Sequence, residues 1–211
     1  MAYVLGFFAA DGNMIKNNRG AHYIAFYSTD FSIIKTVRNL LRSNHKIALK
    51  KLNRPNPRWK DSYQLQIGSK EIFKDLLKLK LTPNKSLTME MASVPNNQLG
   101  HFIRGYFDGD GCVYFKQNWA KDRNKLRWVF QIKFTSGSRQ FLKSLHSIIK
   151  TLKICKGGFV YSRRDGHELC FSHHDGLALF HFMYDNVPAD MYLERKYKTF
   201  QKAISTLHLG A

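Results

Sequence analysis

Apolar and polar positions follow the same order in the two halves of the chain. The best-matched segments are residues 3–12 and 102–111, which are largely apolar, end in Asp-Gly and lie 99 residues apart. After each segment come residues that alternate as in strands, then apolar residues at helical spacing, then two more strand-like runs and a second helix. Such duplicated periodicity predicts two copies of an α-β-β-α-β-β-α unit and therefore an α+β fold.

The individual elements can be placed from this pattern. The first half is expected to contain a strand at His22–Ser28, a helix at 31–41, strands at 47–53 and 61–67 joined by a turn at Pro55-Asn-Pro57, and a helix at 71–79. The second half is expected to contain strands at 112–117 and 125–135, a helix at 139–152, a hairpin across Asp165-Gly166 and a helix at 175–184. An Asp-Gly pair between alternating runs is a strong hairpin signal. The extra length of the second half is expected in a loop at 118–125.

The repeat divides the chain into an N-terminal half, residues 1–98, and a C-terminal half, residues 99–211. Neither half has an obvious core that is large enough to make it stable alone, because small domains bury a modest share of their surface. We therefore expect the halves to pack as a pseudo-twofold pair within one chain, as a monomer.

The net charge of the chain indicates what kind of partner it binds. The chain has 34 Lys and Arg against 15 Asp and Glu, a net charge of +19. Residues 1–98 carry 16 basic and 6 acidic residues, a net +10, and residues 99–211 carry 18 and 9, a net +9. A globular chain with this excess usually binds a polyanion, and both halves are equally suited to it.

The cysteines and the apolar N-terminal segment exclude other classes of protein. Cys112, Cys155 and Cys170 have no C-x-x-C spacing, so we expect buried thiols rather than disulfides or a thiolate zinc site. The spacing of His173, His174 and His181 gives little support to zinc without such cysteines. The apolar run 2–10 stops at Asp11, so we expect no membrane segment and an intracellular protein.

The repeated segments carry small residues at matched positions. Gly6 and Ala10 in the first, and Gly105 and Gly109 in the second, are four residues apart and so share a helix face. Small residues at this spacing allow two helix backbones to approach closely. If the helices pack along these faces, their C-terminal ends meet.

Each of these helices would end in Asp-Gly, at Asp11-Gly12 and Asp110-Gly111. The glycines are expected to adopt the left-handed backbone that ends many helices. Two carboxylates beside helix-end carbonyls would form an oxygen-only pocket that suits Mg²⁺. A single Asp-Gly is usually only a helix end followed by a turn, but a matched pair favours a site.

Strand alternation also defines two polar faces. Leu126, Trp128, Phe130, Ile132 and Phe134 would face the core, leaving Arg127, Val129, Gln131 and Lys133 on the other side. In the first half Ile24 and Phe26 would be buried, with Tyr23, Ala25 and Tyr27 outward, and a further polar face would come from Ser62, Gln64 and Gln66. Such a face can also be simply solvated.

The paired segments Val4-Leu-Gly-Phe-Phe-Ala-Ala-Asp-Gly12 and Ile103-Arg-Gly-Tyr-Phe-Asp-Gly-Asp-Gly111 resemble the motifs of the LAGLIDADG homing endonucleases in their single-chain, two-motif form. The similarity extends in outline over almost the whole chain. It implies a saddle of two antiparallel sheets over the major groove of double-stranded DNA, with the motif helices at the interface and divalent metals beneath them.

Residue roles follow from the resemblance. It implies that Asp11 and Asp110 are the catalytic metal ligands and that the carbonyls of Ala10 and Gly109 are auxiliary ligands. Mg²⁺ is the implied cofactor, and Ca²⁺ can substitute for binding without cleavage. Ala9 replaces the first acidic residue of the motif, which Asp108 retains, at a position that is not the usual metal ligand. Lys85 and Lys196 match the basic positions near the scissile phosphates, with Arg195 or Lys198 as alternatives to Lys196.

The resemblance also implies that the polar residues on the strands and near the hairpin ends contact DNA. Side chains on strands would read base edges, whereas side chains near hairpin ends would grip phosphates. The residues expected to contact DNA are Tyr23, Tyr27, Lys50, Arg58, Gln64, Gln66, Arg127, Gln131, Lys133, Arg163 and Arg164, with Lys51, Arg54 and Lys60 as further phosphate contacts.

The implied reaction is hydrolysis of one phosphodiester in each strand of a long target. The two reading faces differ, which predicts a non-palindromic target for an intron-encoded or free-standing enzyme. The alternative is an RNA maturase or a DNA-binding regulator on the same scaffold without cleavage. We expect a cytoplasmic or nucleoid location in a prokaryote or phage host, or an organelle.

Overall fold

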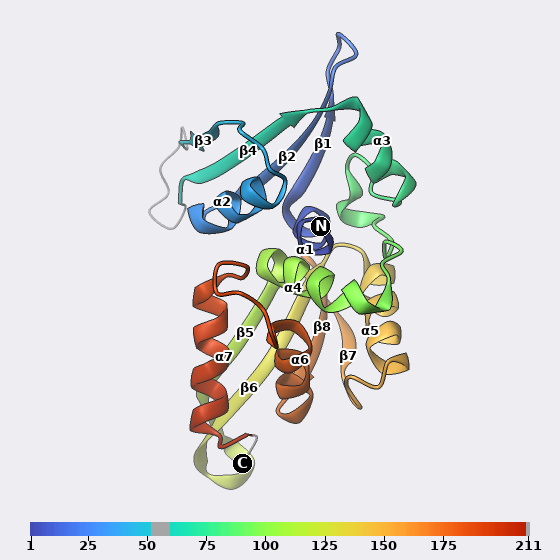
Figure 1. The fold of residues 1–211 in the computed structure, drawn as a ribbon. Coiled ribbons are helices and arrows are strands. Elements are labelled where there is room, and N and C mark those ends of the chain that lie inside the picture. Colours follow the sequence, from blue (N-terminus) through green and yellow to red (C-terminus); the bar gives the residue numbers. More distant parts are fainter. Residues whose placement is uncertain (52–59, 210–211) are drawn as a thin grey trace.

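The computed structural model describes residues 1–51 and 60–209, which form two four-stranded antiparallel sheets, one in each half (Figure 1). The first half contains α1 (Ala2–Asp11), β1 (Gly12–Lys16), β2 (His22–Ser28), α2 (Phe31–Leu40), β3 (Ile47–Lys50), β4 (Ser62–Gly68) and α3 (Lys70–Lys78). The second half contains α4 (Leu99–Asp110), β5 (Gly111–Ala120), β6 (Lys125–Ser136), α5 (Arg139–Thr151), β7 (Phe159–Arg163), β8 (Gly166–Ser172), α6 (His174–Tyr184) and α7 (Glu194–Thr206). Short 3-10 turns lie at Lys85–Leu87, Asn96–Gln98 and Lys121–Arg123.

The two sheets have the same topology. Their strand orders are β1-β2-β4-β3 and β5-β6-β8-β7, and each half contains the expected α-β-β-α-β-β-α unit, to which the second half adds α7. Helices α1 and α4 lie side by side at the junction, with one sheet on each side of them (Figure 1). The α+β class and the duplicated architecture that the sequence predicts are confirmed.

The local sequence explains where the flanking helices begin. Ser69 precedes α3 and accepts a hydrogen bond from the Ile72 amide at 3.2 Å, and Ser138 precedes α5 and accepts one from the Phe141 amide at 3.2 Å. Serine at this position satisfies an amide that the helix leaves without a partner. Helices α1 and α4 have no such side-chain cap and are held instead by burial on nearly all sides.

Helix α7 was not predicted, and it completes the core of the second half. Its buried residues include Phe200 and Ala203, and the Phe200 ring lies 5.6 Å from Phe107 and 6.1 Å from Phe130, measured between centroids. Its outward positions are mostly Lys, Glu, Gln and Thr, so few apolar residues mark it in the sequence.

The second half differs from expectation in one hairpin. Residues 118–120 continue β5 and pair with 125–127 of β6, so the extra length extends two strands instead of forming a loop throughout. Trp119 and Leu126 near its tip are 56% and 57% exposed, because the hairpin extends beyond the helices that cover the core. The turn expected at Pro55-Asn-Pro57 lies outside the described residues.

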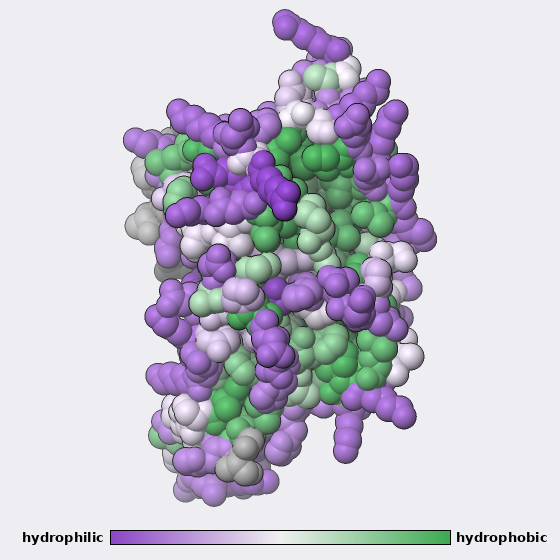
Figure 2. Space-filling view, in the orientation of Figure 1, coloured by the Kyte–Doolittle hydropathy of each residue, from purple (hydrophilic) through white to green (hydrophobic). Residues whose placement is uncertain are grey.

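The first half carries an apolar pocket of about 440 Å³ on the side of its sheet that the helices cover. Its lining residues include Val4 and Phe8 of α1, Ile72 and Leu76 of α3, and Pro95 before α4. Figure 2 shows hydrophobic side chains gathered on this side of the molecule between polar margins. Within the described part of the chain, no helix is both long and apolar enough to cross a membrane.

Candidate functional site

The backbones of α1 and α4 approach at the two glycines that the sequence pattern placed on facing surfaces. A Cβ atom added at Gly6 would lie 1.9 Å from the Phe102 carbonyl oxygen, and one at Gly105 would lie 2.0 Å from the Tyr3 carbonyl oxygen. A Cβ at Gly109 would lie 2.5 Å from the Ala10 side chain. No side chain fits at Gly6 or Gly105 without moving backbone, so this contact requires glycine.

Asp11 and Asp110 are the last residues of the two packed helices. The expected left-handed backbone after them is wrong: Gly12 has φ −89° and Gly111 has φ −98°, both extended, because each glycine begins a strand at once. The glycines are required by space. A Cβ would lie 2.3 Å from the Phe8 ring at Gly12 and 2.1 Å from the Phe107 ring at Gly111.

The two carboxylates lie close enough to repel each other. Burial, followed by the charge of Asp110, raises the pKa of Asp11 to about 7. Burial also raises the pKa of Asp110, and the ammonium groups of Lys196 and Lys85 oppose the rise at both carboxylates. A pair of partly desolvated like charges is unfavourable unless a cation joins it.

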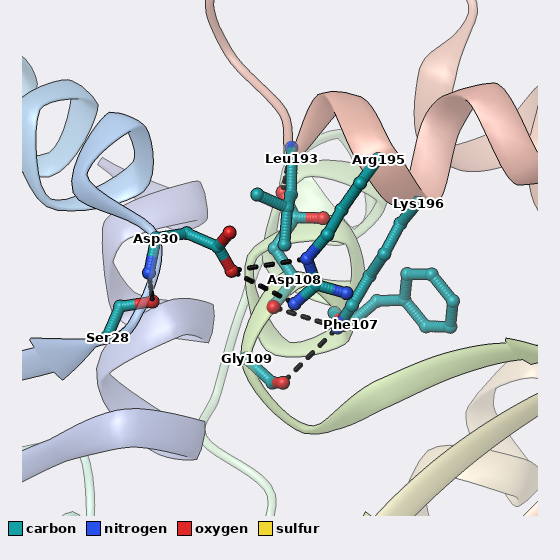
Figure 3. Close-up of polar contacts among 8 residues, drawn as sticks. All are labelled: Ser28, Asp30, Phe107, Asp108, Gly109, Leu193, Arg195 and Lys196. Carbon is teal, nitrogen blue, oxygen red and sulfur yellow. Dashed lines mark hydrogen bonds and ion pairs between the residues drawn. The ribbon is translucent and has the colours of Figure 1, made fainter. Parts of the chain in front are cut away.

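Lys85 and Lys196, from different elements, reach the two helix ends. They are only 6% and 5% exposed. The Lys85 ammonium donates to the Gly12 carbonyl. The Lys196 ammonium donates to the carbonyls of Phe107, Asp108 and Gly109 at 2.6, 2.8 and 3.2 Å (Figure 3). Burial lowers the pKa of Lys85, and lowers that of Lys196 to about 8. A cation is favourable at the carbonyl end of a helix.

The donor set fits a hard divalent cation. Asp11 and Asp110 are the anionic groups at the ends of α1 and α4. Within residues 1–51 and 60–209, no cluster of three His, Cys, Asp or Glu that could hold a metal occurs. Carbonyl oxygens, water and a substrate oxygen would complete an all-oxygen shell of the kind that Mg²⁺ prefers. His173, His174 and His181 are among the residues that form no such cluster.

Asp108 has a structural role that sequence reasoning missed. One of its carboxylate oxygens accepts hydrogen bonds from the Tyr3 hydroxyl at 2.8 Å and from the Leu193 amide at 3.0 Å, just before α7. Burial raises the pKa of Asp108 to about 6. Asp108 thus joins α1, α4 and the start of the helix that carries Lys196.

Arg104 was also missed, because its partners are backbone carbonyls distant in sequence. It is fully buried, and its guanidinium donates to the carbonyls of Met191 and Met183 at 3.0 and 2.7 Å. These bonds fix the segment between α6 and α7. Arg104 lies one helical turn before Asp108 on α4, and both residues hold the chain that leads into α7.

An ion pair joins the two halves beside the carboxylates. Arg195 donates to the carboxylate of Asp30 at 3.0 and 3.2 Å, and Figure 3 shows this pair reaching across from α7 to the residue before α2. The pair borders a polar pocket of about 300 Å³ that Asp11 and Gly109 also line. Arg195 was an alternative to Lys196 as the basic residue near the scissile phosphate. Its side chain is 60% exposed and forms an ion pair with Asp30.

The strand residues expected to contact DNA share one face of each sheet. Directly paired residues project to the same side, and the pairs Ala25–Gln66, Tyr27–Gln64 and Lys50–Ser62 place the first set together. The pairs Asn118–Arg127, Tyr114–Gln131 and Cys112–Lys133 do the same in the second half. Alternation along β5 puts Tyr114, Lys116 and Asn118 on this face. The same alternation in the sequence could have identified these three residues as part of the polar face.

Three expectations about this face need correction. Ala25, expected outward, is fully buried, since larger side chains surround a methyl group on the same face. Gln64 is only 6% exposed. Cys112, expected to be buried, is exposed at the start of β5, whereas Cys155 and Cys170 are buried.

The other basic residues that were expected to contact phosphates lie near hairpin ends, as far as they fall within the described residues. Lys50, Lys51, Lys60, Arg163 and Arg164 are exposed. Arg54 and Arg58 lie outside the described residues.

A duplicated α+β fold, with paired carboxylates at the ends of two packed helices and a polar face on each sheet, defines a two-repeat protein with one composite site. The model of the LAGLIDADG-like domain matches residues 1–79 and 97–169, and the chain belongs to this family.

Solved structures agree on the fold. I-SmaMI bound to an uncleavable DNA is 14% identical, with 98% of this chain and 90% of that chain covered and a TM-score of 0.62. I-AabMI bound to uncleaved DNA is 13% identical, with 99% and 90% covered and a TM-score of 0.63. I-SmaMI bound to cleaved DNA is 13% identical, with 98% and 89% covered and a TM-score of 0.60. No curated protein sequence matches the chain.

Proposed function

We propose that this chain is a divalent-metal-dependent, site-specific DNA endonuclease that hydrolyses one phosphodiester in each strand of a long, non-palindromic target. The observation that carries the proposal is the meeting of Asp11 and Asp110 at the ends of α1 and α4, with the buried Lys85 and Lys196 beside them. A capping role explains a single Asp-Gly, but not two carboxylates and two buried lysines at one junction.

The similar structures support DNA as the substrate. I-SmaMI is described bound to uncleaved DNA with calcium ions and bound to cleaved DNA, and I-AabMI is described bound to uncleaved DNA. The net charge of +19 and the polar face on each sheet suit the same partner here. One chain supplies both halves, which favours a monomer acting on unlike half-sites.

Asp11 and Asp110 would hold the metal, together with the carbonyls of Ala10 and Gly109. A divalent ion bound there would supply Lewis acidity and a more acidic water molecule for phosphodiester hydrolysis. The ammonium groups of Lys85 and Lys196 lie at the two helix ends, where they can stabilise negative charge that develops on a phosphate oxygen. Their carbonyl partners keep both amines in place before substrate binds.

The cellular setting is part of the proposal. We expect an intron-encoded or free-standing homing enzyme that acts inside a prokaryotic or phage-infected cell, in the cytoplasm or nucleoid, or in an organelle. The reducing setting suits three free cysteines without a disulfide among the described residues.

The test is cleavage of a plasmid library that carries the native flanking locus of the coding sequence. The wild-type protein should cut with Mg²⁺ and bind without cutting with Ca²⁺, whereas Asp11→Asn and Asp110→Asn should bind and not cut. Asp165→Asn, which removes an exposed carboxylate at the β7–β8 turn, is the matched control and should cut normally. Binding of DNA or RNA without cleavage in any divalent ion would favour the maturase or regulator alternative and contradict this proposal.

A further inference from the structure

Gln64 and Glu168 occupy equivalent places in the two sheets. Gly12 pairs with Phe26 and Gly111 with Phe134, and the next residues along β2 and β6 pair with Gln64 and Glu168 respectively. Both positions lie on an interior strand of their sheet, on the polar face. The sequence pattern assigned no role to Glu168.

Glu168 lies on β8 and holds three neighbours, one on β6 and two on β7. Its carboxylate accepts a hydrogen bond from the Tyr161 hydroxyl, lies 2.9 Å from the Arg163 guanidinium and lies 3.8 Å from the Lys133 ammonium. Arg163 also donates to the Tyr161 hydroxyl at 3.2 Å. The Glu168 side chain is only 13% exposed, so its charge lies beneath the groups that it holds.

Gln64 holds its neighbours in the same way without a charge. Its amide nitrogen donates to the Tyr27 hydroxyl at 2.8 Å and to the Gln66 side-chain oxygen at 3.1 Å. The first sheet therefore presents a neutral array, whereas the second presents two cations joined by one carboxylate.

The carboxylate changes what the two cations can do. Lys and Arg that are free to move grip phosphates of any sequence, which raises affinity without discrimination. A carboxylate between them removes one of their two positive charges from the surface and restricts their rotamers. Side chains fixed on a sheet in this way are suited to base edges, and lose less conformational entropy when they bind.

We propose that Glu168 is a specificity-determining residue of the second half, which orders Lys133, Tyr161 and Arg163 for base recognition and suppresses their sequence-independent grip on DNA. This inference rests on the proposed function, since it assigns a role within the same DNA surface. Glu168 acts through the residues that it holds and is a positioning residue.

The decisive variant is Glu168→Gln. Glutamine has the same size and stands at the equivalent position 64, so the sheet can accommodate it. Asp165→Asn removes a carboxylate from the exposed turn of the same hairpin, and Asp165 takes part in none of the contacts of Glu168 and Arg163 described above. Thermal unfolding of both variants measures whether the fold is retained.

The probes are a randomised duplex library, the target that the wild-type protein enriches from it, and an unrelated duplex of equal length. Glu168→Gln should bind the unrelated duplex several-fold more tightly, with a steeper salt dependence, and should reduce the ratio of specific to non-specific affinity by on the order of tenfold. Sequence preference should weaken at a few adjacent positions of one half-site only. Asp165→Asn should leave the affinity ratio and the preferences close to wild type.

The outcomes separate the two proposals. An enriched and cleaved wild-type target, with the Glu168→Gln affinity ratio within twofold of wild type, would overturn this inference and leave the proposed function intact. The same drop in the affinity ratio for Asp165→Asn would also overturn it, because general charge would then explain the effect. A wild-type protein that enriches no sequence would overturn both.

Discussion

The Tyr3 hydroxyl donates a hydrogen bond to the Asp108 carboxylate at 2.8 Å, although the two residues are 105 positions apart. The bond crosses the interface of α1 and α4 and is buried. Because Asp108 also accepts from the Leu193 amide, the same carboxylate connects the helix pair to the start of α7. The first repeat has Ala9 at the matching position, so the two halves support their lysines differently.

Replacing Asp108 should therefore affect the second half more than the first. Asp108→Ala leaves the Tyr3 hydroxyl and the Leu193 amide without their acceptor, which should reduce the free energy of unfolding by about 2 to 4 kcal/mol. Lys196 should also lose its alignment, so one DNA strand should be cut more slowly than the other. Strand-specific labelling of the cleavage products measures this.

Tyr3→Phe is the matched control, because it removes one bond and leaves the Leu193 bond in place. It should destabilise the protein by a smaller amount and keep the two strand rates close. Equal slowing of both strands by Asp108→Ala would contradict a selective effect through α7.

The helix interface provides a second prediction. Gly105→Val places side-chain atoms where the Tyr3 carbonyl already lies, so the helices must separate. We expect a loss of more than about 3 kcal/mol of stability, together with loss of cleavage, since Asp11 and Asp110 would no longer meet. Denaturant unfolding and plasmid cleavage measure both effects. Gly68→Ala, whose nearest neighbour would be the Tyr23 ring at 3.4 Å, should cost much less.

The duplicated pattern was sufficient to predict the fold. Matching motifs at 3–12 and 102–111, followed by the same order of strands and helices, define a two-repeat architecture from local periodicity alone. Helix α7 was missed because its apolar positions are few. The backbone at Gly12 was wrongly expected to be left-handed because the sequence does not show that a strand follows without a turn.

The site was less fully predictable. Asp11, Asp110, Lys85 and Lys196 could be chosen from the motifs, and the structure places all four at the two helix ends. The supporting contacts of Arg104, Asp108 and Glu168 join residues from separate elements, and a sequence gives no distances between such residues. Their roles required tertiary structure.

The two lysines should contribute to cleavage without being required for folding. Lys85→Met and Lys196→Met keep the apolar stem of the side chain and remove the buried ammonium. Each should slow cleavage by on the order of a hundredfold, if the amine stabilises charge on the reacting phosphate. Because each amine serves one helix end, nicked DNA should accumulate, with opposite strands intact in the two variants. Linear product formed at wild-type rates, or loss of folding in both variants, would contradict these roles.

The raised pKa of Asp11, about 7, predicts how the metal-free protein responds to pH. An unfolded aspartate titrates near pH 4. Between these values the folded protein holds a proton that the unfolded chain releases, so stability should fall as pH rises from about 4 to 7 and level off above that. The contribution is at most about 4 kcal/mol.

Calorimetric unfolding with a chelator at pH 4.5, 6 and 8 tests this dependence. Asp11→Asn should raise the melting temperature at pH 8 and leave it nearly unchanged at pH 4.5, whereas Asp165→Asn should do neither. Part of the slope should persist, because the pKa of Asp108 is also raised, to about 6. Mg²⁺ should raise the melting temperature of the wild-type protein more at pH 8 than at pH 5, since a proton competes with the metal for Asp11. An Asp11→Asn protein with the wild-type pH profile would show that this carboxylate is not the group that titrates.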